Sequence, residues 1–122
     1  MIFDKPNSVD LLEAVNHFLD TKIKSEVPAH LAFKIRIVEN VLNIVKREIE
    51  QGDELSKEIM VQLQDLIEQD SPTIDALALL IKDEKIDLED QGLKDLLVTL
   101  SKNKIAVDNP NYSTYKKLLD RI

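Results

Sequence analysis

Cysteine is absent from the 122-residue sequence, and this absence excludes disulfide bonds, thiolate zinc sites and cysteine nucleophiles. A chain without cysteine fits a reducing compartment. Charged residues interrupt the apolar positions of the first thirty residues, so no signal peptide or transmembrane span is expected there. We therefore predict a cytoplasmic protein that does not bind membranes.

Chain breakers and aromatic residues are also scarce. The sequence has only two glycines and four prolines, and aromatic residues make up 4% of it. Long uninterrupted elements are therefore expected, and 43% hydrophobic residues suffice for one core without metals or disulfides. We predict an all-α fold, a single domain over residues 1–122, with about five to six helices in a bundle.

Positive charge is scarce in the middle of the chain. The net charge is −7 overall, and residues 48–95 carry 15 acidic but only 4 basic side chains. An acidic segment of this kind repels a phosphate backbone, so we predict no nucleic-acid partner.

The longest apolar pattern lies between residues 28 and 50. Apolar residues recur there at steps of 4, 3, 4, 3 and 4, which places them on one face of a helix, and a second apolar stripe lies beside the first. We expect this segment to be a central hydrophobic helix that the other helices enclose. The first stripe consists of Leu31, Ile35, Val38, Leu42, Val45 and Ile49, and the second of Phe33, Ile37, Val41 and Ile44.

Capping residues, glycines and prolines divide the rest of the chain. Asn7 or Ser8 begins the first helix, Gly52 ends the central helix and Asp53 caps the next one. Asp70 or Ser71, just before Pro72, starts a short helix. Asp87 or Leu88 precedes a later helix, which stops at Asn109-Pro110, and a short one ends the chain. The predicted helices cover about residues 7–23, 28–50, 54–68, 72–83, 88–108 and 113–122.

Residue patterns that carry catalysis or bind metals are missing. Neither histidine, His17 or His30, is followed by an acidic residue four positions later, and the His-x-x-x-His and Glu-x-x-His patterns of a metal site are missing. No serine lies in a Gly-x-Ser-x-Gly turn, and Gly52 and Gly92 lack the glycine neighbours of a phosphate-binding loop. We therefore predict no catalytic residue, no metal and no cofactor; this favours a non-enzymatic protein without excluding an enzyme.

A polar stripe crosses the apolar segment 28–50. Its residues, Arg36, Asn40, Asn43 and Arg47, follow one another at steps of 4, 3 and 4. A buried arginine is costly unless acceptors pair with it. Three interpretations are open: a solvated face, a structural network or subunit contact, and a ligand site.

Three segments together resemble a small bacterial family of uncharacterised all-helical domains of unknown function. They are residues 31–48 (LAFKIRIVENVLNIVKRE), residues 104–112 (KIAVDNPNY), and the opening LLEAV of residues 11–15 with Phe18-Leu19. The resemblance covers nearly the whole chain, although residues 51–100 match only in helical character. Its members are commonly encoded beside aminoglycoside-phosphotransferase-like kinases and acyl-CoA dehydrogenases, which implies an accessory or partner role.

Three hypotheses about function follow. The first is a non-enzymatic interaction module whose protein partner is a phosphotransferase-like kinase. The second is a small-molecule site, binding or enzymatic, in which Arg36, Asn40 and Arg47 hold an acyl-CoA or another phosphate-bearing ligand, because arginine forks suit phosphate groups. The third is a homodimer built on the stripe of the central helix. The ligand-binding candidates are Arg36, Asn40, Arg47, Lys104, Asn109 and Tyr112.

Overall fold

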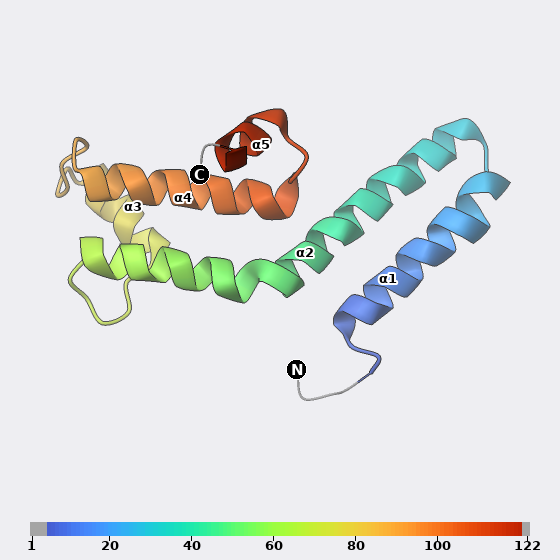
Figure 1. Cartoon of the computed structure of the whole chain (residues 1–122), viewed down its shortest axis with the longest axis horizontal. Helices are drawn as coiled ribbons and strands as arrows, with labels where there is room; N and C mark the ends of the chain where they lie inside the picture. The colour runs from blue at the N-terminus through green and yellow to red at the C-terminus, as the bar shows by residue number, and fades with distance from the viewer. Residues whose placement is uncertain (1–4, 121–122) are drawn as a thin grey trace. The chain divides into compact units, whose positions relative to one another are not determined.

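The structure is a computed structural model that describes residues 5–120 (Figure 1). Every regular element in this range is helical, which confirms the predicted all-α class. No helix in the described range is both long and apolar enough to cross a membrane. The α-helices are α1 (Ser8–Phe18), α2 (Ala29–Leu66), α3 (Ile74–Lys82), α4 (Gln91–Asp108) and α5 (Ser113–Asp120).

The chain divides into two compact units between Gly52 and Asp53. The first unit contains α1 and the beginning of α2, and the second contains the end of α2 together with α3, α4 and α5. Helix α2 belongs to both, since its backbone is helical from Ala29 to Leu66. The assignment of residues 1–122 to one domain stays a prediction.

In the first unit, α1 begins where its capping residues predict. The Asn7 side chain accepts a hydrogen bond from the Asp10 N–H at 3.0 Å, and the Asp10 carboxylate accepts one from the Asn7 N–H at 3.0 Å. These reciprocal bonds form a capping box. The helical backbone continues beyond Phe18 as a π-helix over Leu19–Ile23 and a 3₁₀ turn over Lys24–Glu26. The prediction of a cap at Asn7 is therefore confirmed.

The predicted break of the central helix at Gly52 is wrong. Gly52 has no positive φ, and Asp53 continues α2 instead of capping a new helix. A Cβ atom at Gly52 would meet only the Cγ of Glu48, at 3.9 Å, so ordinary helical backbone fits there. The segment 54–68 was expected to be a separate helix but forms the last part of α2. Glycine lowers helix propensity by about 1 kcal/mol, too little to interrupt a helix whose end is packed.

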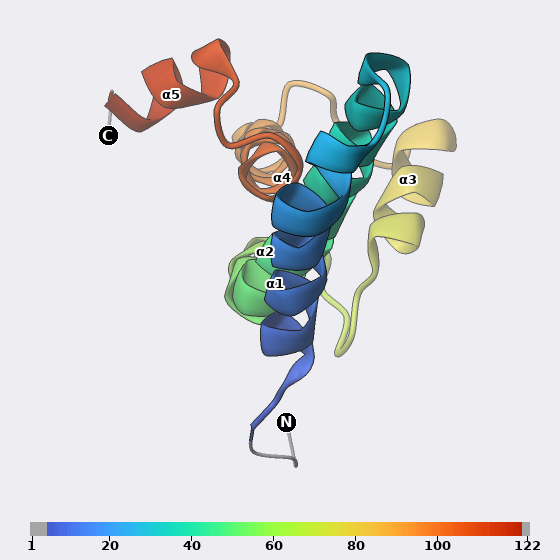
Figure 2. The same cartoon turned by 90° about the vertical axis from the view of Figure 1, so that its right-hand side faces the viewer.

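The hydrophobic core lies in the second unit, where α3 and α4 flank the end of α2 (Figure 2). The expectation that residues 28–50 form the enclosed central helix is wrong, because no side chain between Ala29 and Gly52 is buried. Chain segments that were predicted to lie outside it supply the core instead. The buried core cluster consists of Leu63, Ile67, Leu77, Leu93 and Leu96.

Two helix starts in the second unit differ from the prediction. Thr73 caps α3, because its Oγ1 accepts a hydrogen bond from the Ala76 N–H at 3.0 Å, while Pro72 is buried before it. Asp90 caps α4, and its carboxylate accepts from the Leu93 N–H at 3.0 Å. The predicted caps, Asp70 or Ser71 and Asp87 or Leu88, therefore lie too early. The carboxylate of Asp87 instead accepts from the Glu89 N–H at 2.9 Å in a turn.

The predicted helix ends near Asp83 and Asn109 are confirmed. Helix α3 ends in a turn with Glu84 at φ 55°, where Lys85 N–H donates to Leu80 O and Glu84 N–H to Ile81 O. This hydrogen-bond pattern is a Schellman motif, here with glutamate at the position that usually holds glycine. Asn109 caps the end of α4, and α5 follows as the predicted final helix, of which the predicted residues 121–122 lie outside the described range.

Candidate functional site

Polar side chains connect helix α1 to α2. Glu13 pairs with Lys46 at 2.8 Å, and the Asn16 Nδ2 donates to the Asn43 Oδ1 at 2.9 Å. A step of three residues forward along α1 thus matches a step of three residues back along α2, as two antiparallel helices require. Nearer the turn, Lys24 lies 3.5 Å from Glu39. We call Glu39, Asn43 and Lys46 the polar face of α2.

Ion pairs in this contact and in the segment that follows α1 shift the pKa values of their members. A hydrogen bond from Lys24 holds the pKa of the Asp20 carboxyl below its ordinary value of 3.8, and the same bond raises the pKa of Lys24. The bond to Glu13 likewise raises the pKa of Lys46 above 10.5. Because Asp20 binds its proton more weakly in the folded chain, its ion pair stabilises the folded state above the unfolded pKa.

We expect acid to weaken the first unit through Asp20. Its contribution is present at neutral pH and is lost as the pH falls below 3.8 through the lower folded pKa. In Asp20→Asn, helicity followed by circular dichroism during an acid titration should fall less steeply in this range than in the natural chain. Asp75→Asn, which changes an exposed carboxyl on α3, is the matched control. Identical titrations of the natural chain and Asp20→Asn would contradict the assignment.

Large hydrophobic side chains remain exposed on both helices of the first unit. Ten of them are between 37% and 60% exposed, although none of the described residues of this unit is buried. Scattered exposed hydrophobic residues are normal, but a contiguous set marks an interaction surface. They are Leu11, Val15 and Phe18 on α1, and Leu31, Phe33, Ile37, Val38, Val41, Val45 and Ile49 on α2.

These hydrophobic residues form two separate faces of α2. At 3.6 residues per turn, Phe33, Ile37 and Val41 follow one ridge, which we call the Phe33 ridge. The heptad stripe lies about a third of a turn away around the helix. It consists of Leu31, Ile35, Val38, Leu42, Val45 and Ile49, of which Ile35 and Leu42 are half-buried. The polar face toward α1 occupies the remaining third, so α1 covers neither apolar face fully.

The residues predicted to bind a ligand fall into two groups. Arg36, Asn40 and Arg47 belong to α2 in the first unit, where Arg36 and Asn40 are exposed and Arg47 is half-buried. Of the polar stripe, Asn43 has a structural role, since it bonds to Asn16. The ligand hypothesis for the other three residues stays a prediction.

The remaining ligand-binding candidates lie in the second unit at the end of α4. Lys104 pairs with Asp108 on the same helix at 3.1 Å, and Asn109 caps this helix. The Asn109 carbonyl also accepts a hydrogen bond from the N–H of Tyr112, whose side chain is exposed. The structure thus gives Lys104 and Asn109 local structural contacts, and binding by these residues stays a prediction.

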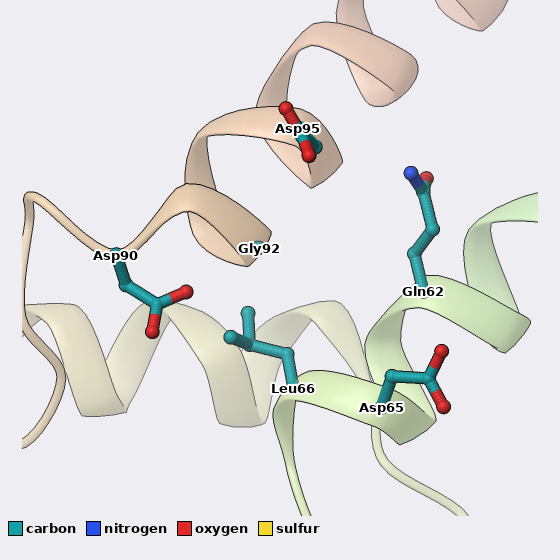
Figure 3. Close-up of a pocket in the computed structure, with 6 residues that line it drawn as sticks. All are labelled: Gln62, Asp65, Leu66, Asp90, Gly92 and Asp95. Carbon is teal, nitrogen blue, oxygen red and sulfur yellow. The ribbon is translucent and has the colours of Figure 1, made fainter.

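An open hollow of about 400 Å³ lies in the second unit between α2 and the start of α4 (Figure 3). Two of its carboxylates are engaged: Asp90 caps α4, and Asp95 accepts from the Gln91 side chain at 2.8 Å. No group of three or more potential metal ligands occurs among residues 5–120. The lining residues are Gln62, Asp65, Leu66, Asp90, Gly92 and Asp95.

Gly92 allows the close packing beside this hollow. A Cβ atom there would approach the Asp90 Oδ1 to 3.1 Å and the Leu66 Cδ1 to 3.6 Å. It would therefore crowd the carboxylate that caps α4. The sequence pattern considered Gly92 only for a phosphate-binding loop, whose glycine neighbours it lacks.

The contacts with α1 are the part of the site that the pattern did not predict. The sequence pattern indicated no contact for Glu13, whereas its carboxylate pairs with Lys46. The one feature of the sequence that indicated these contacts was Asn43, a polar residue within an apolar helix. A polar side chain removed from water needs a hydrogen-bond partner.

Comparison with family models identifies the chain's relatives. The model described as Domain of unknown function (DUF6285) matches residues 25–112. The chain belongs to this family. The DUF6285 match contains α2, α3 and α4 completely, and with them both apolar faces of α2. The predicted membership in an uncharacterised family is thus confirmed. No curated protein and no solved structure matches the chain.

Proposed function

We propose that the chain is a non-enzymatic interaction module that binds a protein partner through the first unit. The observation that carries this proposal is the set of ten exposed hydrophobic side chains on α1 and α2. Folded monomers seldom keep so many large apolar side chains in water along one pair of helices. Burial of such side chains against another protein supplies the main driving force of association.

The partner that we propose is a phosphotransferase-like kinase, the enzyme class implied by the genes that accompany the family. We assign it to the Phe33 ridge. The three ridge residues are spaced at steps of four, which suits insertion of one helix edge into an apolar groove. Phe33 is the most exposed of them and the largest, so it serves as the main anchor.

Co-purification tests this proposal. The tagged chain is co-expressed with a phosphotransferase-like kinase encoded beside a gene of this family, and we expect a stable complex. Ile37→Asp should weaken binding at least about thirtyfold, because it places a charge in the buried centre of the contact. Ile74→Asp on α3 is the matched control, since Ile74 is similarly exposed but lies in the second unit.

These binding measurements test both the identity of the partner and the surface that it contacts. Failure to recover a complex, with a folded chain and a folded kinase, would refute the kinase as partner. Equal kinase binding by Ile37→Asp and the natural chain would show that the contact does not include the Phe33 ridge. Circular dichroism of both variants checks that the exposed substitutions leave the helices intact.

A further inference from the structure

The heptad stripe has the spacing of a coiled-coil seam. Apolar residues at steps of 4, 3, 4, 3 and 4 alternate between the a and d positions of a heptad, where Ile35, Leu42 and Ile49 are a residues and Leu31, Val38 and Val45 are d residues. Such a seam is stable when another helix packs its side chains between them. Helix α1 fills this role only in part, because Leu31, Val38, Val45 and Ile49 remain exposed while Ile35 and Leu42 are half-buried.

We propose that the heptad stripe binds the stripe of a second copy of this chain in antiparallel orientation. Two first units then form a four-helix arrangement with α2 at its centre. Leu11, Val15 and Phe18, which are exposed on α1 at steps of 4 and 3, extend the apolar surface on each copy. The seam of this dimer is a different face from the Phe33 ridge, of which only Val41 lies beside the seam, at a g position. The dimer therefore goes beyond the proposed kinase contact and does not depend on it.

The positions of the stripe residues favour a two-fold pairing. In an antiparallel pair, a residues meet d residues of the other helix. A two-fold axis near residue 40 places Leu31 against the partner subunit's Ile49, Ile35 against the partner subunit's Val45, and Val38 against the partner subunit's Leu42. Every residue of the stripe then has a partner of the required class, and none is left over at either end.

Charges beside the stripe also match in this orientation. Lys34 and Glu48 occupy the g positions, which face each other across an antiparallel pair. Lys34 thus lies beside the partner subunit's Glu48, and the symmetry repeats this opposite-charge pair. Both side chains are exposed in the single chain. A parallel pair would direct Lys34 toward Glu39 of the partner subunit, yet Glu39 already pairs with Lys24.

The size and net charge of the first unit are compatible with self-association. From Leu31 to Ile49 the stripe is about 27 Å long, and two adjacent helices are about 20 Å wide. This footprint of about 540 Å² approaches the area of about 800 Å² that a stable interface buries on each partner. Residues 1–52 carry 7 basic and 8 acidic side chains, so two first units repel each other little.

Mass measurement tests the dimer. We expect light scattering of the purified full chain to give about twice 13.9 kDa. Val38→Glu should shift the mass to that of the monomer and raise the dimer dissociation constant at least about thirtyfold. Val61→Glu is the matched control: Val61 is on the same helix and is 59% exposed, against 47% for Val38, but it belongs to the second unit. We expect it to remain a dimer.

A charge exchange tests the pairing of Lys34 with Glu48. Lys34→Glu alone places like charges side by side twice in each dimer, and we expect about tenfold weaker association. The double variant Lys34→Glu with Glu48→Lys restores opposite charges and should recover the natural affinity. Recovery requires that the two positions meet across the interface, so weakening without recovery would refute the register.

Spin labels measure the orientation directly, since the chain has no cysteine to compete with an introduced one. In an antiparallel dimer, labels at Val41→Cys should lie within about 20 Å of each other, whereas labels at Gln51→Cys should be about 33 Å apart along the helices. Equal distances would refute the antiparallel pairing.

The mass of the natural chain separates this proposal from the kinase proposal. A monomer at all concentrations would refute the dimer, whereas the kinase proposal depends only on co-purification. A dimer that persists in Val38→Glu would also refute the proposal, because self-association would then use another surface.

Discussion

Leu96→Ala is expected to lower the free energy of unfolding of the second unit by about 2–5 kcal/mol. Leu96 is 0% exposed and belongs to the core cluster with Leu63, Leu77 and Leu93, which come from three helices. Removal of its side chain loses apolar burial and leaves a cavity that these helices fill only in part. Chemical denaturation followed by circular dichroism measures the change.

Leu97→Ala provides the matched control for this prediction. Leu97 is the next residue of α4 and is 44% exposed, so the same substitution should cost less than about 1 kcal/mol. Equal losses at Leu96 and Leu97 would contradict the position of the core. The pair also tests the finding that the core lies in the second unit rather than around residues 28–50.

Gly52→Pro is expected to lower the free energy of unfolding by about 3 kcal/mol or more, and Gly52→Ala to raise it by about 0.5–1 kcal/mol. Gly52 is inside α2 with helical backbone, so proline removes a hydrogen bond and clashes with the preceding turn. Alanine fits, because its Cβ meets only an ordinary contact with Glu48 at 3.9 Å. Thermal and chemical unfolding of the three chains gives both changes.

The sign of the alanine result decides between a continuous and a broken helix. If Gly52 ended a helix in the left-handed conformation, alanine would destabilise the chain by about 1 kcal/mol. Gln51→Ala, at the exposed neighbouring position, should change stability by less than about 0.5 kcal/mol in either case. A lower free energy of unfolding in Gly52→Ala would therefore support the helix break that the sequence pattern predicts.

Periodicity was sufficient to predict the helices, because the 3.6-residue repeat depends only on the backbone and on nearby side chains. Asn7 and Asn109 were correctly assigned as helix boundaries for the same reason: their hydrogen bonds stay within a few residues. Gly52 was misassigned, since the sequence does not show that packing of Leu63 holds the end of α2. Local propensity predicts a break there, and tertiary contacts decide otherwise.

The location of the core could not be predicted from hydrophobicity. Residues 28–50 carry the longest apolar pattern, yet burial depends on which faces meet. Helix α1 presents Glu13 and Asn16 to α2, so it covers polar residues and leaves Phe33 and Val38 exposed. The candidate binding surface was visible in the sequence as an apolar stripe, but it was interpreted as core because the sequence does not state what covers it.

The continuity of α2 has a consequence for recognition. Winding the first turn of a helix is unfavourable, while each further residue adds to an existing end at little cost. Core contacts hold the end of α2 around Leu63 in helical form. This part nucleates the helix, and the residues back to Ala29 extend it. A binding partner then meets a preformed helical surface, so less conformational entropy is lost on association.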